Sequence, residues 1–330
     1  MTRVLLVFGG EGSEHDVSVM SARNVVEALN NADYEVILAY ITRTGDWLAA
    51  HTIDDITAQP ISIDRIDIDV IFPLIHGKGG EDGMIAKMGQ ISNIPVVGCG
   101  PEASAIAWDK DRCKQTLQAA GLAVVPWLTV NEGESITYET ARQKLDSDTL
   151  FIKPAREGSS IGVSKVTSEQ EFAKALEEAF YRDDKILIEK AIVGRELECA
   201  ILGNLPDIQA TDVGEVRANA DFYDYSAKYT ADSAAATDIP ALGLSNDIRQ
   251  EIQDSAKKAY VAIGGSGLSR IDFFLATDGT IYINEINTMP GFTNISMYPK
   301  LWQHSGISYS DLASRLIKLA VDGYTSNKIS

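Results

Sequence analysis

Residues Ser269–Asn287, which read SRIDFFLATDGTIYINEIN, carry the strongest structural signal in the sequence. Two runs rich in β-forming residues flank Asp278-Gly279, a dipeptide that favours a two-residue hairpin turn because both positions tolerate positive φ. Residues that lie opposite each other in such a hairpin share a face and sit close together. Counting outward from the turn gives three pairs: Thr277 with Thr280, Asp272 with Glu285, and Arg270 with Asn287.

This register places two acids, an amide and an arginine on one face of the hairpin. Its other positions are apolar enough to be buried: Ile271, Phe273, Phe274, Leu275, Ile281, Ile283 and Ile286. Buried carboxylates that face each other repel and lose hydration, so they need a cation or a shared proton. Oxygen ligands with no His or Cys nearby suit Mg²⁺ or Mn²⁺, and Mg²⁺ usually accompanies a phosphate-bearing substrate. We therefore predict a metal site at Asp272 and Glu285; the alternative is a surface hairpin with solvated acids.

The composition bounds the class of protein. A chain of 330 residues with 45% hydrophobic content can bury a large core and is long for one domain, so two or three domains are expected. The net charge of −18 argues against nucleic acid or an anionic membrane surface as the main partner. An acidic protein also repels nucleotide phosphates, so any nucleotide site must gather lysines and arginines.

Neither the cysteines nor the N-terminus indicates export. Cys99, Cys113 and Cys199 are odd in number and far apart, which fits neither a disulfide framework nor a zinc motif and suits a reducing cytosol. The apolar run at residues 4–8 is too short for a signal peptide or a membrane span. We expect a cytoplasmic protein.

The first hundred residues are typical of an α/β domain. Strands are expected at residues 3–8, 36–41, 70–75 and 95–97, and a helix at 16–30. Glu14 lies where a strand, a glycine turn and a helix start meet, which can form a ligand site; the alternative is a first-turn acid stabilised by the helix dipole. His76 opens a glycine-rich segment that lets a ligand approach the backbone, although it could be an ordinary loop histidine.

The next part of the chain alternates helices and strands. Helices are expected at 110–120, 138–145, 169–180 and 246–263, and strands at 124–130, 185–190 and 195–202. Residues 151–165 are expected to form two strands joined by a turn rich in glycine and serine. The amides of residues 158–160 and the amine of Lys153 could enclose phosphate oxygens, or this could be an exposed hairpin turn. Residues 218–240 show no periodicity, which is typical of a lid or binding loop.

Taken together, these segments resemble the ATP-grasp superfamily and, within it, the D-alanine–D-alanine ligases. The resemblance implies an α/β and α+β protein in which an N-terminal Rossmann-like (pre-ATP-grasp) domain, residues 1–100, precedes a two-lobed ATP-grasp fold. The central lobe would span residues 101–185, and the C-terminal lobe, with the metal site and lid loop, residues 186–330. The matching segments are Gly9-Gly10 with 13–18, 76–83, Asp109-Lys110, 153–165, Glu189 with Glu196, 222–229, 269–273 and 284–299.

The resemblance also implies that ATP and two Mg²⁺ or Mn²⁺ ions lie between the two lobes. ATP would be contacted by Lys110 and Lys153 at its phosphates together with Ser160, by Glu189 and Lys190 near the adenine, by Glu196 at the ribose, and by Lys228 when its loop closes. The metal ligands would be Asp272, Glu285 and Asn287.

The reaction implied by the resemblance joins two D-alanine molecules through an acylphosphate and supplies peptidoglycan precursors. Arg270 and the amide of Gly291 would face the tetrahedral oxyanion. Glu14, with Ser159 and Tyr229, would hold the first ammonium group, and His76 would belong to the substrate site. Ser296 and the Met297 amide would bind the second carboxylate.

Other functions stay open at this point. A relative could use D-serine or D-lactate as its second substrate, although Tyr229 favours amide formation by analogy with the family. A catalytically silent nucleotide-binding module is a further alternative, against which the intact Arg270, Asp272 and Glu285 speak. The resemblance implies a homodimer, and no nucleic acid or membrane partner is expected.

Overall fold

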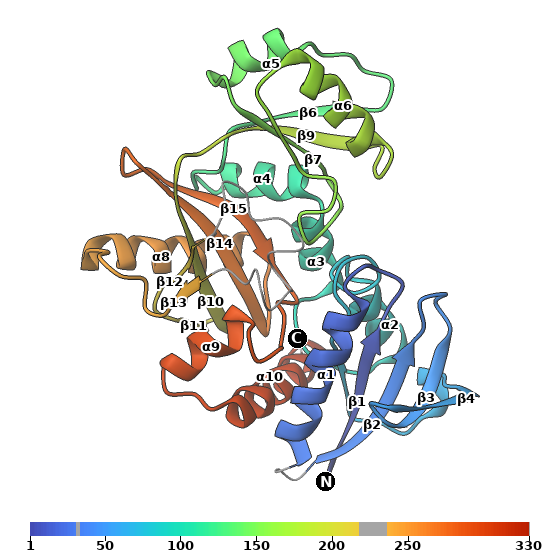
Figure 1. The fold of residues 1–330 in the computed structure, drawn as a ribbon. Helices are drawn as coiled ribbons and strands as arrows, with labels where there is room; N and C mark the ends of the chain where they lie inside the picture. Colours follow the sequence, from blue (N-terminus) through green and yellow to red (C-terminus); the bar gives the residue numbers. More distant parts are fainter. Residues whose placement is uncertain (31–33, 218–235, 330) are drawn as a thin grey trace.

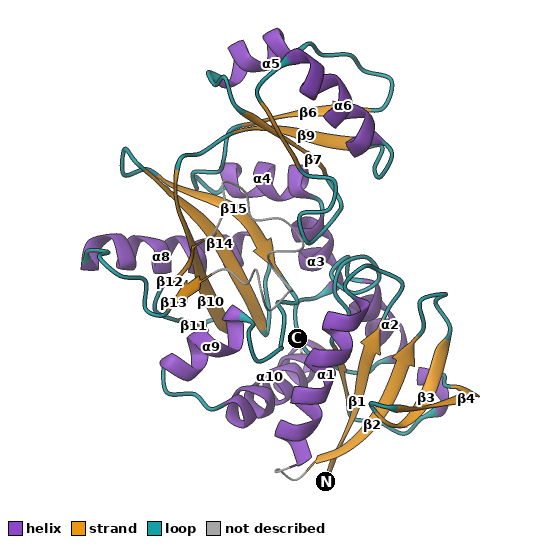
Figure 2. Ribbon diagram, in the orientation of Figure 1, coloured by secondary structure: helices purple, strands orange, loops and turns teal. Residues whose placement is uncertain are grey.

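The computed structural model describes residues 1–30, 34–217 and 236–329. These residues form three β-sheets with helices packed against them (Figures 1 and 2). The N-terminal sheet has the order β4-β3-β2-β1-β5. Its strands are β1 (Thr2–Gly9), β2 (Tyr34–Ile41), β3 (Trp47–Thr52), β4 (Asp55–Pro60) and β5 (Val70–Pro73). Strand β1 runs parallel to both β2 and β5, whereas β3 and β4 are antiparallel additions.

The helices of this domain are α1 (His15–Asn30), the 3₁₀ turn η1 (Ile63–Arg65) and α2 (Met84–Ser92). The predicted α/β unit is confirmed, but the strand expected at residues 95–97 is reduced to a single parallel bridge between Ile71 and Val96. The β3–β4 hairpin was not predicted, because its apolar and polar residues do not alternate regularly.

The central sheet has the order β6-β9-β7-β8. Its strands are β6 (Trp127–Asn131), β9 (Lys185–Lys190), β7 (Leu150–Pro154) and β8 (Ser164–Val166), and helices α5 (Tyr138–Leu145) and α6 (Glu169–Phe180) cover one face. Helices α3 (Pro101–Trp108) and α4 (Lys110–Ala119) precede the sheet in the chain. The strand expected from residue 124 begins at Trp127, and Val124 instead bridges to Ile283 of the C-terminal sheet.

The C-terminal sheet contains the hairpin predicted at Ser269–Asn287. Its order is β13-β12-β10-β14-β15, with β11 paired to β10. The elements of this part are β10 (Gly194–Asn204), β11 (Asp207–Ala210), β12 (Gly214–Arg217), β13 (Ala236–Asp238), α8 (Asn246–Ala262), β14 (Leu268–Ala276), β15 (Ile281–Asn287), α9 (Met297–His304) and α10 (Tyr309–Ile329).

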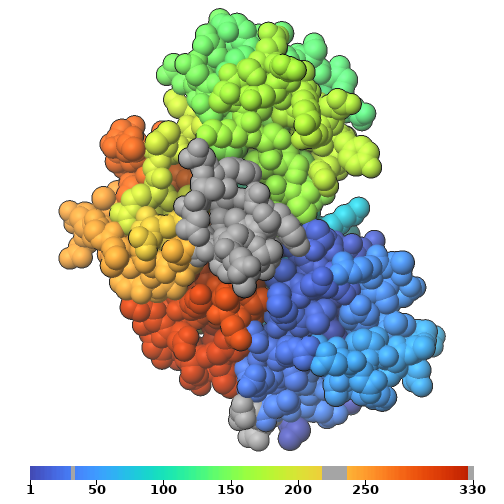
Figure 3. Space-filling view, in the orientation of Figure 1, coloured from blue at the N-terminus to red at the C-terminus, as the bar shows by residue number. Residues whose placement is uncertain are grey.

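The two ends of the chain share one apolar core. Buried Val4 and Phe72 of the N-terminal sheet belong to the same cluster as Leu312 and Leu316 of α10. Figure 1 shows α10 beside α1, and in the space-filling view the C-terminal segment meets the N-terminal part along a continuous surface (Figure 3). The C-terminal helix therefore completes the N-terminal domain.

The hairpin register is confirmed at its functional pairs, although the turn differs from the prediction. Ala276, not Thr277, bonds to Thr280, so residues 277–279 form a three-residue turn, and the Thr277 amide donates to the Val193 carbonyl. This would shift the register by one, but a bulge between the Phe273 and Asp272 pairs shifts it back. Asp272 thus faces Glu285, and Arg270 faces Asn287, as predicted.

Candidate functional site

The acid face of the β14–β15 hairpin is built around Asp272. The Arg270 guanidinium donates to both carboxylate oxygens of Asp272, from Nε to Oδ1 and from Nη2 to Oδ2, each over 2.7 Å. The Asn287 amide donates to Oδ2 of Asp272 over 3.0 Å. Ile271 and Phe273 point the other way into the core, and half-buried Phe274 lies on the acid face, contrary to expectation. The alternation of the strand therefore puts the polar groups together.

A third acid joins this face from β10. Glu198 lies directly opposite Asp272, and its Oε2 is 2.9 Å from Nε of Arg270. Burial opposes the charge of Arg270, but Asp272 and Glu198 outweigh burial and raise the pKa of the guanidinium. Sequence reasoning missed Glu198, because its position depends on how β10 pairs with β14.

The acid face offers an oxygen-only set of metal ligands. Asp272 and Glu285 face each other, and Asn287 contacts Asp272. Among the residues that the structure describes, no group of three His, Cys, Asp or Glu side chains is arranged to bind a metal. The set is therefore two carboxylates and an amide, which fits Mg²⁺ or Mn²⁺ completed by phosphate oxygens and water.

A buried lysine cluster lies between α4 and the central sheet. On the central sheet, Nζ of Lys153 is 2.7 Å from Oε2 of Glu189, and Nζ of Lys114 is 2.9 Å from Oε1 of the same carboxylate. Lys114 comes from α4 and was not predicted to take part. Because both oxygens of Glu189 contact lysines and the residue is 4% exposed, its side chain is turned inward.

Lys110 connects the lysines with the acids. Its ammonium group donates to the Glu157 carbonyl and lies 5.8 Å from the centre of the Trp108 ring. Burial lowers the pKa of Lys110, Glu285 opposes this shift, and Lys153 adds to it. Helix α4, which carries Lys110 and Lys114, also packs against β15, so the acid hairpin and the lysine cluster border the same space.

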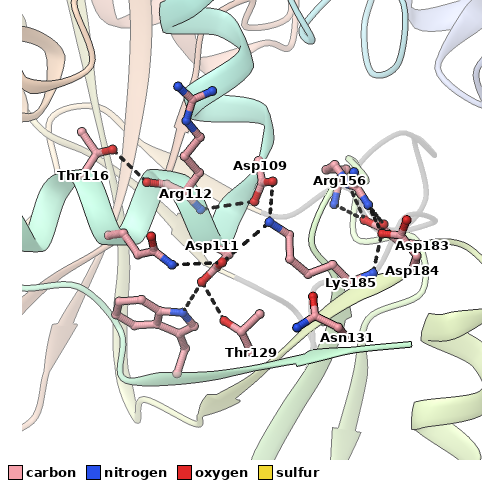
Figure 4. Close-up of polar contacts among 12 residues, drawn as sticks. Asp109, Asp111, Arg112, Thr116, Thr129, Asn131, Arg156, Asp183, Asp184 and Lys185 are labelled. Atoms are coloured by element: carbon pink, nitrogen blue, oxygen red, sulfur yellow. Dashed lines mark hydrogen bonds and ion pairs between the residues drawn. The ribbon is translucent and has the colours of Figure 1, made fainter. Parts of the chain in front are cut away.

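An ion-pair network fixes the start of α4, which carries Lys110 (Figure 4). The side chain of Asp109 caps the helix by accepting from the Arg112 amide, and it also accepts from Nζ of Lys185 over 2.6 Å. Asp111 accepts from Nε1 of Trp127 and Oγ1 of Thr129, both on β6. The first turn of α4 is therefore held to the central sheet.

The turn between β7 and β8 approaches the N-terminal domain. Ser159 and Ser160 both adopt positive φ, 51° and 59°, which is uncommon for residues with a Cβ and is found preferentially at functional sites. A Cβ placed on Gly158 would lie 3.2 Å from Oε2 of Glu14. The structure therefore brings Glu14 next to the serine turn.

His76 links the N-terminal domain to the loop after β15. Its Nδ1 is 3.2 Å from the Met289 carbonyl, and its Nε2 is 3.4 Å from Oγ of Ser21, which accepts from the Phe292 amide. Burial lowers the pKa of His76, with Glu14 opposing. His76 therefore holds the loop that follows the acid strand.

Glu81, beside His76, is a partly buried acid. Its Oε1 is 3.9 Å from Nδ1 of His76. Burial and the negative charge of Glu14 raise the pKa of Glu81 to about 8, and Glu285 contributes in the same direction. The site therefore gathers acidic side chains at its N-terminal side, and Glu81 keeps its proton there near neutral pH.

The loop after β15 brings Gly291 and Ser296 together. A Cβ on Gly291 would lie 2.7 Å from Oγ of Ser296, and that hydroxyl accepts from the Thr293 amide over 3.0 Å. Ser296 precedes α9, whose first residue is the buried Met297. Amide groups at a helix start can bind a carboxylate.

Comparison with known proteins identifies the family. A family model described as the N-terminus of D-ala D-ala ligase matches residues 3–99, and one described as its C-terminus matches residues 116–318. This chain belongs to the D-alanine–D-alanine ligase family.

Individual members of the family align over nearly their whole length. D-alanine–D-alanine ligase A of Escherichia coli (strain K12) is 40% identical, with 98% of this chain and 97% of the relative aligned. The D-alanine–D-alanine ligase of Shouchella clausii (strain KSM-K16) is 42% identical, with 99% of this chain and 96% of the relative aligned.

Solved structures agree with this assignment. The D-alanine–D-alanine ligase from Coxiella burnetii matches with a TM-score of 0.86 and 32% identity, covering 100% of this chain and 98% of that one. The VanG D-Ala:D-Ser ligase from Enterococcus faecalis matches with a TM-score of 0.84 and 33% identity, and the match covers 97% of this chain and 99% of that one. The predicted ATP-grasp architecture is confirmed, and membership of the D-alanine–D-alanine ligase family implies ATP and divalent metal ions.

Two further residues expected from the family resemblance lie within the described ranges. Lys190 lies at the end of β9, with Nζ 4.0 Å from Oδ2 of Asp146, and Glu196 lies on β10 opposite Phe274. Lys228 and Tyr229 fall outside the described residues. No helix in the described ranges is long and apolar enough to cross a membrane.

Proposed function

We propose that this protein joins two D-alanine molecules into D-alanyl-D-alanine, with ATP converted to ADP and phosphate, and so supplies peptidoglycan synthesis. The observation that carries the proposal is the direct opposition of Asp272 and Glu285, with Arg270 beside them and Lys110 within reach of the charge of Glu285. Acids that bind metal, next to cations that bind phosphate, form a site for phosphoryl transfer.

The space between acid face and lysine cluster is the proposed ATP site. Two Mg²⁺ or Mn²⁺ ions would be held by Asp272, Glu285 and Asn287, and when bound they would neutralise charge on the transferred phosphoryl group. The proposed ATP contacts are Lys110, Lys153 and Ser160 at the phosphates, Glu189 and Lys190 near the adenine, Glu196 at the ribose and Lys228 from its loop. The Glu189 side chain already binds two lysines, so we propose that the backbone of Glu189 contacts the adenine.

The first D-alanine would bind between the N-terminal domain and the serine turn. Glu14 would accept from its ammonium group, with Ser159 and Tyr229 completing the network and His76 fixing the loop behind it. The close approach of Gly158 to Glu14 supports this placement. The carboxylate of this D-alanine would attack the γ-phosphorus of ATP, which gives an acylphosphate and ADP.

The second D-alanine would bind beside the loop after β15. The hydroxyl of Ser296 and the amide of Met297 would take its carboxylate, and its amine would displace phosphate from the acylphosphate. Arg270 and the amide of Gly291 would stabilise the oxyanion that forms. The contact between Gly291 and Ser296 supports adjacent roles for them.

Identification of the product tests the proposal. The protein is incubated with ATP, Mg²⁺ and D-alanine, and the expected product is D-alanyl-D-alanine with one ADP released per dipeptide. The alternative function is ligation of D-alanine to D-serine or D-lactate. It would be favoured if D-alanine alone gave no turnover and addition of D-serine or D-lactate did. The similarity to a D-Ala:D-Ser ligase is the observation that supports this alternative.

We propose that the chain has three parts. The first boundary lies near residue 100. The sequence predicts the second boundary after residue 185, but β9 belongs as a whole to the central sheet, so we place this boundary after Lys190. A homodimer in the cytoplasm is proposed from the family alone.

A further inference from the structure

Lys114 is buried, although no step of the proposed reaction uses it. It comes from the middle of α4 and is 1% exposed. Its Nζ lies 2.9 Å from Oε1 of Glu189, 3.1 Å from the Val125 carbonyl oxygen and 5.8 Å from the centre of the Trp127 ring. Lysine is almost never fully buried unless it is paired, so Glu189 is the partner that permits this position.

Glu189 is shared between two lysines. Its second oxygen, Oε2, is 2.7 Å from Nζ of Lys153, which is 6% exposed. Burial opposes ionisation of Glu189, but Lys114 and Lys153 outweigh burial and lower the pKa of the carboxyl. Two ammonium groups against one carboxylate leave an excess of positive charge in the interior.

The excess charge lies where the phosphates are proposed to bind. Lys153 lowers the pKa of Lys110, so the two ammonium groups are close enough to repel each other. Uncompensated charge in a protein interior is costly, and the cost falls when an anion binds. The cluster therefore suits a polyanionic ligand better than a structural ion pair, in which the charges would cancel.

We propose that Lys114 is a positioning residue for the nucleotide: by holding one oxygen of Glu189, it keeps Glu189 from neutralising Lys153, which retains its charge for phosphate. This inference rests on the proposed function, because it takes Lys153 as a phosphate ligand. Without Lys114, the carboxylate would pair with Lys153 alone and form a neutral pair beside the nucleotide.

Three variants test this inference. Lys114→Met removes the charge and keeps the stem, Lys114→Arg keeps the charge, and Lys114→Met combined with Glu189→Gln removes the carboxylate as well. Lys174→Met is the matched control, since Lys174 is an exposed lysine of α6. The readouts are the affinity for ADP with Mg²⁺, measured by calorimetry, and separate KM values for ATP and D-alanine.

We expect Lys114→Met to weaken ADP binding at least about tenfold and to raise the KM for ATP, because Lys153 loses its net charge. The KM for D-alanine should not change, and Lys114→Arg and Lys174→Met should bind ADP nearly as the wild type does. The double variant should bind ADP more tightly than Lys114→Met, because no carboxylate remains to neutralise Lys153. A role in packing alone predicts the opposite order, since the double variant loses more contacts.

Lys114→Gln is made in parallel, because it keeps a hydrogen-bond donor for Glu189 and provides a second neutral variant if Lys114→Met does not fold. Wild-type ADP affinity in either folded neutral variant would overturn the inference, as would a double variant that binds ADP no better than Lys114→Met. A wild-type protein that binds ADP but forms no dipeptide would instead overturn the proposed function alone.

Discussion

Arg270 and Asp272 are joined by two parallel hydrogen bonds of 2.7 Å on the same face of β14. A bidentate pair of this kind fixes the carboxylate plane and neutralises it. The partner across the hairpin, Glu285, faces Asp272 without sharing that bidentate pair. Asp272 is therefore held in place by the protein itself, and Glu285 is the acid of this pair whose charge acts on the pKa of Lys110.

Glu285→Ala should reduce ligase turnover about a hundredfold or more, because a metal ligand is lost. The free energy of unfolding of the metal-free protein should fall by less than about 1 kcal/mol. The fall is small because removal of one of two facing acids relieves their repulsion, which offsets the loss of the side chain. Turnover is followed by ADP release and stability by urea denaturation. Retained activity would contradict the metal assignment.

Gly291→Ala should lower kcat/KM for D-alanine about 10- to 100-fold, because the new methyl group would displace the Ser296 hydroxyl that lies 2.7 Å from its position. Steady-state kinetics with D-alanine as the varied substrate measure the effect. Gly100→Ala is the matched control, since a Cβ there meets no atom within 4 Å. If both variants lose activity equally, the contact with Ser296 is not the cause.

Glu81→Gln should stabilise the protein more at about pH 8 than at about pH 5. The folded protein holds the Glu81 proton up to a pKa of about 8, whereas the ordinary pKa of the side chain is 4.5. Between these values the unfolded chain releases a proton that the folded chain keeps, so this group lowers stability as pH rises. Urea denaturation of both proteins across this range measures the difference. A difference that does not vary with pH would contradict the raised pKa.

Lys185→Met should lower the free energy of unfolding by about 1–3 kcal/mol, because partly buried Asp109 loses a charged donor at 2.6 Å and Asp111 loses a nearby cation. Lys174→Met, at a position with 78% of its side chain exposed, should change it by less than about 0.5 kcal/mol. Equal losses in urea denaturation would show that the network in Figure 4 does not stabilise the protein.

The sequence predicted the local elements well where the pattern was strong. Helix α6 and strand β9 begin and end where expected, because each carries a clear periodicity between polar boundaries. The pairing of Asp272 with Glu285 was predicted as well, but from a turn that does not form. Two departures cancel, since the longer turn and the bulge each shift the register by one residue.

Residues that enter the site through tertiary packing were not predictable in the same way. Lys114 stands four residues after Lys110 and looks like a solvated helical lysine until α4 is placed on the central sheet. Glu198 becomes part of the acid face only through the pairing of β10 with β14. In both cases the deciding contact joins segments that lie far apart in the sequence.

The shared core of the two chain ends has a consequence for biosynthesis. Domains usually fold one after another as the nascent chain leaves the ribosome, starting from the N-terminus. Here Val4 and Leu6 share one core with Leu312 and Leu316, which are translated much later than the first sheet. The apolar core on the first sheet is therefore completed only after α10 has left the ribosome, and until then the exposed face of the sheet is a natural target for chaperones.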